Sequence, residues 1–218
     1  MRLTSDDLPP DLREGQFDIT LIYNEDDRNE ALTFKAIIEK YIKMGNQHAT
    51  VCTIDQHLTW IQPMIGHLGE AIRRSNFAFL YITDSFREGR FTQLQKDECL
   101  MESIYNNDKP GFTIPVYTSE DQKKLSPTGL RGVKGIHLYR LVIQRMADLD
   151  VDALNLKSSD FDKWELKRIT DMISGALPKR LQREMEQAEA ISKWLDDKAN
   201  ETSSNSSSLE TELYKPRC

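Results

Sequence analysis

The feature that most constrains the fold of this sequence is an unbroken apolar run at residues 77–82, which stands between polar segments. A strand that is apolar at every position must be covered on both faces, and such strands are typical of the centre of a parallel sheet. Amphipathic helical patterns and short apolar strands alternate on both sides of this run. The alternation favours a parallel sheet with helices packed on both faces.

Five strands are expected, at residues 17–23, 49–54, 77–82, 112–117 and 136–139. Helices are expected between and after them, at 34–42, 64–75, 91–105, a segment capped by Ser159, and 179–198. In a chain of this length the flavodoxin-like strand order 2-1-3-4-5 is the natural arrangement of an α/β sheet. Pro115 lacks a backbone N–H, so we expect an irregularity or limited pairing in the fourth strand.

The polar parts of the sequence gather at its two ends and indicate how the chain is organised. We expect a flexible leader over 1–15, a folded domain over 16–178 and an amphipathic helix over 179–199. Residues 200–218 are expected to be a disordered tail, because 201–208 contain no apolar side chain. The helix has barely two heptads of apolar stripe, so we favour packing against the domain over docking of an effector.

Composition excludes several classes of protein. The formal net charge of −6 argues against general nucleic-acid binding, which needs a basic surface. No stretch approaches the length of a transmembrane helix, and neither end carries a signal peptide or a lipidation motif. The three cysteines are odd in number and far apart, which indicates a reducing compartment. We therefore expect a cytoplasmic protein.

Two motifs suggest phosphate chemistry, and each has a simpler interpretation. Glu25, Asp26 and Asp27 follow the first strand and Asp84 follows the third, as in phosphoryl-accepting receiver domains, but no lysine ends the fifth strand. We interpret the acidic turn as helix capping. The glycines at 129, 132 and 135, with Arg131 and Lys134 between them, could cradle a phosphate. Their spacing fits no known phosphate loop, which favours a turn-rich connector.

No cofactor or metal is expected, because the four histidines lack metal-ligand spacing and the cysteines lack a paired base. The loop at 56–63 draws more interest, since Trp60 and Ile61 are bulky apolar residues in an exposed connection. This loop is either a protein-contact site or a segment whose Trp60 folds back onto the core. Its candidate contact residues are Gln56, His57, Leu58, Thr59, Trp60, Ile61 and Pro63.

The sequence resembles TIR (Toll/interleukin-1 receptor) domains over about residues 16–178. The run 17–23, FDITLIY, is similar to the family's first box, (F/Y)-D-x-F-(I/V)-S-Y. Thr83 to Phe86, followed by Phe91, is similar to the motif (S/T)-x-x-(F/Y)-x(4,5)-W that follows the family's third strand. Features such as Phe91-x-x-x-Gln95 and Ile114-Pro115 resemble the TRIF/TRAM-type Toll-receptor adaptors more narrowly.

Two departures from the family pattern bear on function. The loop after the second strand lacks the R-D-x-x-P-G motif of the second box. TIR domains that hydrolyse NAD carry W-C-x-x-E, and here Gln95 holds the place of that glutamate. An amide can neither accept a proton nor supply the negative charge that stabilises an oxocarbenium-like state. Glu98 is displaced along the same helix, so we expect no NAD cleavage.

The resemblance implies a non-enzymatic adaptor of innate-immune signalling that works by association with other TIR domains, including copies of itself. The loop around Trp60 and the helix that begins near Phe91 would form complementary surfaces. The acidic residues 25–27 and the pair Arg73 and Arg74 are candidate electrostatic partners between protomers. The alternatives are a TIR-type NAD hydrolase with a displaced glutamate and another flavodoxin-like ligand-binding domain.

Overall fold

The structure is a computed structural model, and it describes residues 16–44, 46–53, 64–106, 111–141 and 162–212. By its internal contacts the chain divides into a compact unit, Phe17–Arg180, and a second unit that includes the chain from Leu181 onward. The bounds of the first unit lie close to those of the expected domain.

The sheet of the first unit has five strands, all paired in parallel: β1 (Phe17–Ile22), β4 (Val51–Thr53), β5 (Ser75–Ile82), β6 (Thr113–Tyr117) and β7 (Ile136–His137). Their spatial order is β4-β1-β5-β6-β7. Counted along the chain, these five strands lie in the order 2-1-3-4-5, which confirms the predicted fold class. The apolar run at 77–82 belongs to β5, at the centre of the sheet.

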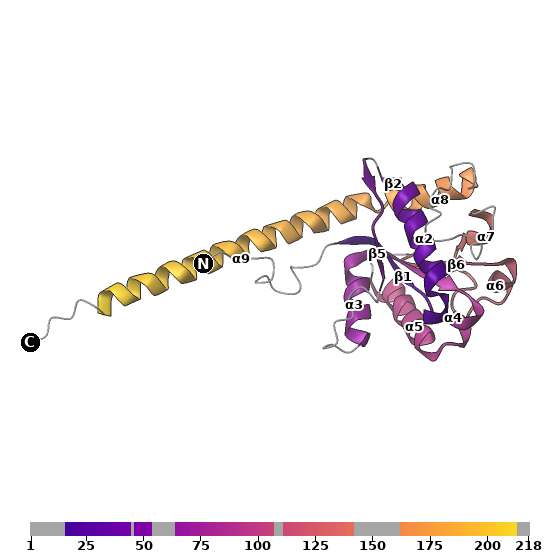
Figure 1. The fold of residues 1–218 in the computed structure, drawn as a ribbon, viewed down its shortest axis with the longest axis horizontal. Helices are drawn as coiled ribbons and strands as arrows, with labels where there is room; N and C mark the ends of the chain where they lie inside the picture. The colour runs from indigo at the N-terminus through magenta and orange to yellow at the C-terminus, as the bar shows by residue number, and fades with distance from the viewer. Residues whose placement is uncertain (1–15, 45, 54–63, 107–110, 142–161, 213–218) are drawn as a thin grey trace, which may run out of the picture. The chain divides into compact units, whose positions relative to one another are not determined.

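The helices of this unit are α2 (Arg28–Tyr41), α3 (Met64–Arg74), α4 (Asp84–Glu88), α5 (Arg90–Tyr105), α6 (Glu120–Lys124), α7 (Leu138–Leu141) and α8 (Lys163–Ser174). A single 3-10 turn, η2 (Glu25–Asp27), precedes α2. A short hairpin that the sequence did not predict, β2 (Lys43–Met44) and β3 (Gln47–His48), follows α2. Figure 1 shows how these helices surround the sheet.

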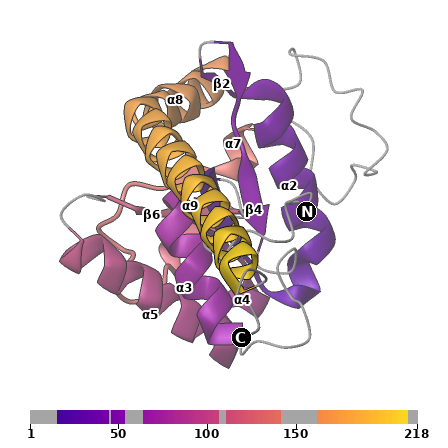
Figure 2. The same cartoon turned by 90° about the vertical axis from the view of Figure 1, so that its left-hand side faces the viewer.

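Alternate side chains of β5 belong to two separate cores, one on each face of the sheet. Phe79 and Tyr81 pack with α2 and α8, whereas Leu80 and Ile82 pack with α3, α4 and α5. Phe34 of α2 contacts both aromatic residues of the first core, with ring centroids 6.4 and 6.1 Å apart. The continuous apolar run is thereby explained, because both faces of the strand are buried. Figure 2 shows α2, α3, α5 and α8 in a view turned by 90° from that of Figure 1.

Three local features differ from the sequence expectations or refine them. The fifth strand ends at His137, and Leu138 already begins α7. The helix expected after Ser159, a residue outside the described ranges, begins at Lys163, where the Asp162 carboxylate accepts from the N–H groups of Trp164 and Glu165. Pairing of β6 with β7 covers positions 116 and 117 because β7 has only two residues. Pro115 itself lies within the continuous register of β6 with β5, so the irregularity expected there is not seen.

The last helix, α9 (Leu177–Glu212), runs further than the sequence predicted. The expected helix ended at 199 and the tail from 200 was expected to be disordered, yet the helix includes the serine-rich run at 201–208. Extending an existing helix fixes one residue per hydrogen bond and avoids the cost of nucleation, so serine is tolerated there. Pro178 lies in the first turn of α9, where its missing N–H costs no helical hydrogen bond.

Candidate protein-interaction surface

The predicted interaction loop, with Gln56, His57, Leu58, Thr59, Trp60, Ile61 and Pro63, lies outside the described residues. The other half of the predicted contact is the helix expected from Phe91, which the structure describes as α5. Of the predicted contact, the described residues include α5 and the charged residues that were expected to act with it.

The start of α5 is fixed against the loops that follow β1 and β5. The hydroxyl of Thr92 is buried and donates to the carbonyl oxygens of Phe86 and Gly89, at 2.6 and 2.8 Å. A Cβ atom at Gly89 would stand 2.6 Å from the side chains of Asn24 and Thr92, so a larger residue there would displace these hydrogen-bonded side chains. This close approach holds one side of α5 against the domain and turns the other outward.

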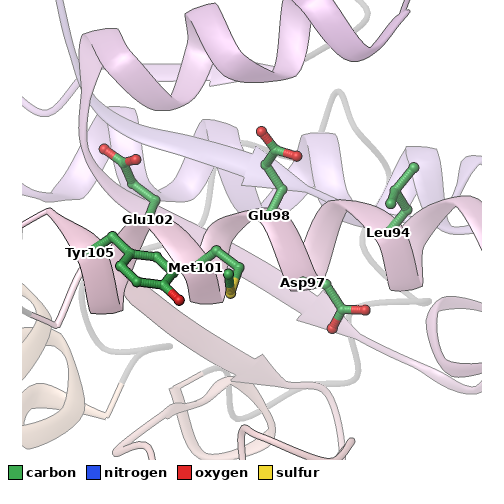
Figure 3. Close-up of a pocket in the computed structure, with 6 residues that line it drawn as sticks. All are labelled: Leu94, Asp97, Glu98, Met101, Glu102 and Tyr105. Carbon is green, nitrogen blue, oxygen red and sulfur yellow. The ribbon is translucent and has the colours of Figure 1, made fainter.

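The outward side of α5 is a hollow of about 400 Å³ that combines apolar and acidic side chains. Figure 3 shows its six lining residues, all from this helix: Leu94, Asp97, Glu98, Met101, Glu102 and Tyr105. The side chains of Leu94, Met101 and Tyr105 are 48%, 50% and 74% exposed. These six residues, which we call the α5 face, recur at the spacing that places side chains on one side of a helix.

Large exposed apolar side chains beside one another are typical of protein contact sites. In Figure 3 the carboxylates of Glu98 and Glu102 lie to one side of Met101 and Tyr105, and that of Asp97 lies to the other. No cationic side chain is among the lining residues that the structure describes. The α5 face is therefore suited to a partner that is apolar at its centre and neutral or basic at its edges.

Gln95 lies on the opposite, buried side of α5 and is only 3% exposed. Its Oε1 atom is buried with no hydrogen-bond partner among the described residues. The neighbouring Lys96 is also buried, and its Nζ donates to Gln93 Oε1 and lies near Asp97 Oδ1, each at 3.1 Å. Glu98, the nearest glutamate to Gln95 along the helix, lines the α5 face instead.

The acidic turn after β1 makes several contacts within its own domain. Asn24 caps η2 by accepting from the N–H of Asp26 at 3.0 Å, and it donates to the carbonyl of Ser85 at 3.0 Å. Asp27 accepts from the hydroxyl of Thr83 at 2.5 Å. Burial raises the pKa of Asp27, and the bond from Thr83 partly opposes that rise. The turn thus links the ends of β1 and β5, while Glu25 and Asp26 remain exposed.

The other carboxylate near this edge, Asp84, is part of a capping arrangement and lies at the surface. It pairs with Arg87, and hydrogen bonds from Gln122 and Arg87 lower its pKa. Thr83 accepts from the N–H of Phe86 and so caps α4. The capping side chains are therefore Asn24 and Thr83, whereas Asp27, the residue before α2, makes no side-chain capping bond. The expectation that the acidic side chains of the turn themselves cap a helix is not met.

The two arginines of α3 differ in their position. Glu70 accepts from Arg73 at 2.6 and 3.0 Å and also from Arg74, and these bonds, chiefly those of Arg73, lower the pKa of Glu70 to about 2. The side chain of Arg73 is 58% exposed, whereas that of Arg74 is 2% exposed. Of the pair expected to reach a second protomer, Arg74 is therefore committed to the interior of its own domain.

Sequence reasoning placed the contact helix but did not find the residues of the α5 face. Apolar residues occur on both sides of this helix: Leu94 and Met101 are exposed, whereas Cys99 is buried. Periodicity alone therefore could not separate its two sides. Among the described residues, no three histidine, cysteine or acidic side chains gather as metal ligands would. Cys52 and Cys99 are buried free thiols.

Comparison with known proteins gave one kind of match. No protein-family model and no curated protein matches the sequence. Among solved structures, the chain is similar to the TIR domains in the activated Roq1 resistosome that directly recognises the pathogen effector XopQ. The two are 16% identical, with a TM-score of 0.42, and the match covers 72% of this chain and 99% of the other. Within the described ranges, no helix combines the length and apolar composition needed to cross a membrane.

Proposed function

We propose that this protein is a non-enzymatic signalling adaptor of the TIR type, similar to the TRIF/TRAM-type adaptors, and that it acts by association with other TIR domains. The observation that carries the proposal is the α5 face, an exposed apolar and acidic surface on the helix that the sequence motifs indicated. The family motifs at 17–23 and 83–86 support the assignment to TIR proteins. The buried free thiols are in keeping with the cytoplasm.

The partner of the α5 face is the 56–63 loop of a second TIR domain, including a second copy of this chain. In this sequence that loop carries Leu58, Trp60 and Ile61 and no acidic residue, which complements the apolar and acidic character of the α5 face. A loop that binds a different surface on the next copy makes a head-to-tail contact. Such contacts need not close, so repeated association builds an open assembly.

Substitution of Met101 by glutamate tests this contact. Burying a methionine side chain contributes about 1.5–3 kcal/mol, so Met101→Glu should weaken self-association by at least about tenfold. Light scattering over a concentration series measures the change. Leu125→Glu is the matched control, because Leu125 is 54% exposed and lies outside the α5 face. It should leave association unchanged.

Substitution of Trp60 by alanine tests the loop. If Trp60 contacts the α5 face, Trp60→Ala and Met101→Glu remove the same contact, and the double variant should lose little more than either single variant. Normal self-association and normal binding to a receptor TIR domain by Trp60→Ala would count against the loop. Equal effects of Met101→Glu and Leu125→Glu would count against the α5 face.

Absence of NAD hydrolysis is the second part of the proposal. The buried amide of Gln95 and the outward position of Glu98 support it. Purified protein should show no NAD turnover above a heat-denatured sample. A robust turnover that Gln95→Ala removes would instead support the hydrolase alternative.

A further inference from the structure

A second hollow, of about 350 Å³, lies at the carboxyl ends of β6 and β7. Tyr117 and His137, the last residues of these strands, line it together with four basic side chains: Lys123, Lys124, Arg131 and Lys134. In open α/β sheets, ligands bind outside the carboxyl ends of the strands, typically where the strand order reverses. This hollow, which we call the basic hollow, lies at that edge of the sheet but beside its last two strands, so its basic lining is the feature that indicates a ligand site.

The aromatic part of the basic hollow is held in place by the sheet. Tyr117 and His137 are register partners, and their rings stack with centroids 5.9 Å apart and planes at 22°. The hydroxyl of Tyr117 forms a hydrogen bond with that of Ser126 at 3.0 Å. At Gly135 a Cβ atom would stand 2.6 Å from both Pro115 O and the Tyr117 ring. The strand ends are thus packed too closely to rearrange freely.

The basic side chains come from two separate segments of the chain. Lys123 and Lys124 belong to α6, whereas Arg131 and Lys134 belong to the glycine-rich connector that precedes β7. All four are exposed. No acidic residue lines the hollow in the part of the chain that the structure describes. Lys124 lies 3.5 Å from the exposed Asp121, a separation at which an ion pair contributes little.

The nearest buried carboxylate, Glu165 of α8, is already engaged elsewhere. It accepts from the backbone N–H of His137 at 3.0 Å and from Arg168 at 2.5 and 3.0 Å. The pKa of His137 shows which charges prevail near the hollow. Burial, and then Lys123, Arg140 and Arg168, lower the pKa of His137, and Glu165 only partly opposes them. The positive charge around the hollow is therefore not neutralised by its own domain.

We propose that the basic hollow binds a compact anion that carries a phosphate group, held mainly by Lys123 and Lys134 from opposite segments of its rim. Lysine ammonium groups bind phosphate as point charges and need no fixed approach. The connector with Gly129, Gly132 and Gly135 was the segment in which the sequence hinted at phosphate binding. The structure adds two lysines of α6 to that segment, which sequence spacing could not reveal.

An acidic helix of another protein fits this hollow less well than a compact anion does. A surface like the α5 face would bring large apolar side chains with its carboxylates, and these need an apolar counterpart. Among the described lining residues, Val133 is the one aliphatic side chain of the basic hollow, and Tyr117 is only 3% exposed. The proposal does not depend on the TIR-type assembly proposed above.

Nuclear magnetic resonance of the full chain, titrated with inorganic pyrophosphate, tests this site. The amides of Lys134, Gly135 and His137 should shift in a saturable way, beyond the effect of sodium chloride at equal ionic strength. A bound anion should also raise the pKa of His137, which its ring protons report. The double variant Lys123→Gln, Lys134→Gln should bind about tenfold more weakly, because two charges at the rim are lost.

The matched control is Lys43→Gln, Lys193→Gln, which removes the same charge from exposed lysines outside the hollow. It should bind pyrophosphate as the wild type does. Equal weakening in both double variants, or no saturable shift in the wild type, would overturn the proposal. So would an outcome in which pyrophosphate does not bind but Lys123→Gln, Lys134→Gln abolishes self-association, because the hollow would then be a protein contact.

The phosphate could belong to a soluble compound or to a lipid headgroup, and a further arm separates these sources. Phosphatidylcholine vesicles with and without a phosphoinositide are sedimented with the full chain. Binding to the phosphoinositide vesicles alone, displaced by pyrophosphate, would support the site with a lipid source. Pyrophosphate binding without any vesicle binding would support it with a soluble source.

Discussion

Gln95 occupies a position where burial and chemistry both oppose a carboxylate. Its side chain is 3% exposed, and its Oε1 has no hydrogen-bond partner among the described residues. A glutamate introduced there would have its pKa raised by loss of solvation. The charged form of a glutamate at this position is therefore unfavourable at neutral pH.

Gln95→Glu should therefore destabilise the protein without creating NAD hydrolysis. At pH 7 the free energy of unfolding should fall by about 3 kcal/mol, which corresponds to a shift of about two pKa units. The loss should appear as pH rises above the ordinary glutamate pKa, and at pH 3 the variant should match the wild type. Denaturant unfolding at the two pH values measures this, and NAD turnover by a stable variant would contradict it.

At the scale of residues, the sequence predicted some local roles but not which side chains are buried. It identified Asn24 as a capping residue, but the capping expected of its acidic neighbours is not seen. The match of Gln95 to the glutamate of NAD-hydrolysing TIR domains stays a prediction. The sequence could not show that Arg74 is buried beside an exposed Arg73, because that depends on which side of α3 packs against the sheet. Burial of a charged side chain follows from its partner, here Glu70, and that pairing forms only in the folded helix.

At the scale of elements, apolar runs predicted the strands and polar residues predicted the turns between them. Some errors were whole elements, since the β2–β3 hairpin and the short helices α4 and α6 were not predicted. The other errors fell at element ends. The fifth strand stops at His137 because α7 begins at the next residue, and α8 begins at Lys163 because Asp162 satisfies its first N–H groups. Helix ends depend on such individual bonds, whereas helix interiors follow a periodic pattern. This is why the interiors were the more predictable parts.

Helix α3 provides a prediction at this scale, since Glu70 joins both of its C-terminal arginines. Glu70→Gln should lower the free energy of unfolding at pH 7 by about 1–2 kcal/mol, a value reduced for the partial exposure of Glu70. The folded-state pKa of Glu70 lies near 2, below its usual 4.5. The wild-type advantage is therefore full above about pH 4.5 and is lost as pH falls toward 2.

Glu25→Gln is the control for this prediction, because Glu25 forms a pair with Arg28 in which both side chains are largely exposed. It should change the free energy of unfolding by less than about 0.5 kcal/mol at any pH. Thermal unfolding of both variants between pH 3 and 7 provides the comparison. A pH-independent loss in Glu70→Gln would show that its ion pairs are not the cause.

At the scale of the whole molecule, the strand order follows from chain length and from the alternation of strands and helices. Neither interaction surface could be predicted in the same way. The α5 face lies on one helix, but its exposure depends on how that helix packs against the domain. The basic hollow is formed by α6 together with the connector that follows it in the sequence. Surfaces of this kind are assembled by the tertiary structure, so they become visible only when the sheet is in place.

The division at Arg180 predicts that the first unit folds without the rest of α9. Its cores include Ile169 and Ile173 of α8, both fully buried, and α8 is joined to the sheet by the bond from the His137 N–H to Glu165. A chain that ends at Arg180 keeps all of these contacts. Its thermal unfolding midpoint should lie within about 3 °C of the full chain, which corresponds to roughly 1 kcal/mol.

A chain that ends at Asp162 is the matched comparison, because it loses α8 and with it two buried isoleucines and the ion pair of Glu165 with Arg168. Removing so much of one core costs several kcal/mol, since each buried isoleucine contributes about 1.5–3 kcal/mol. The total is a large part of the free energy of unfolding of an ordinary domain, so this shorter chain should show no cooperative unfolding transition. Calorimetry distinguishes the two truncations, and a midpoint far below that of the full chain for the Arg180 truncation would show that α9 stabilises the first unit.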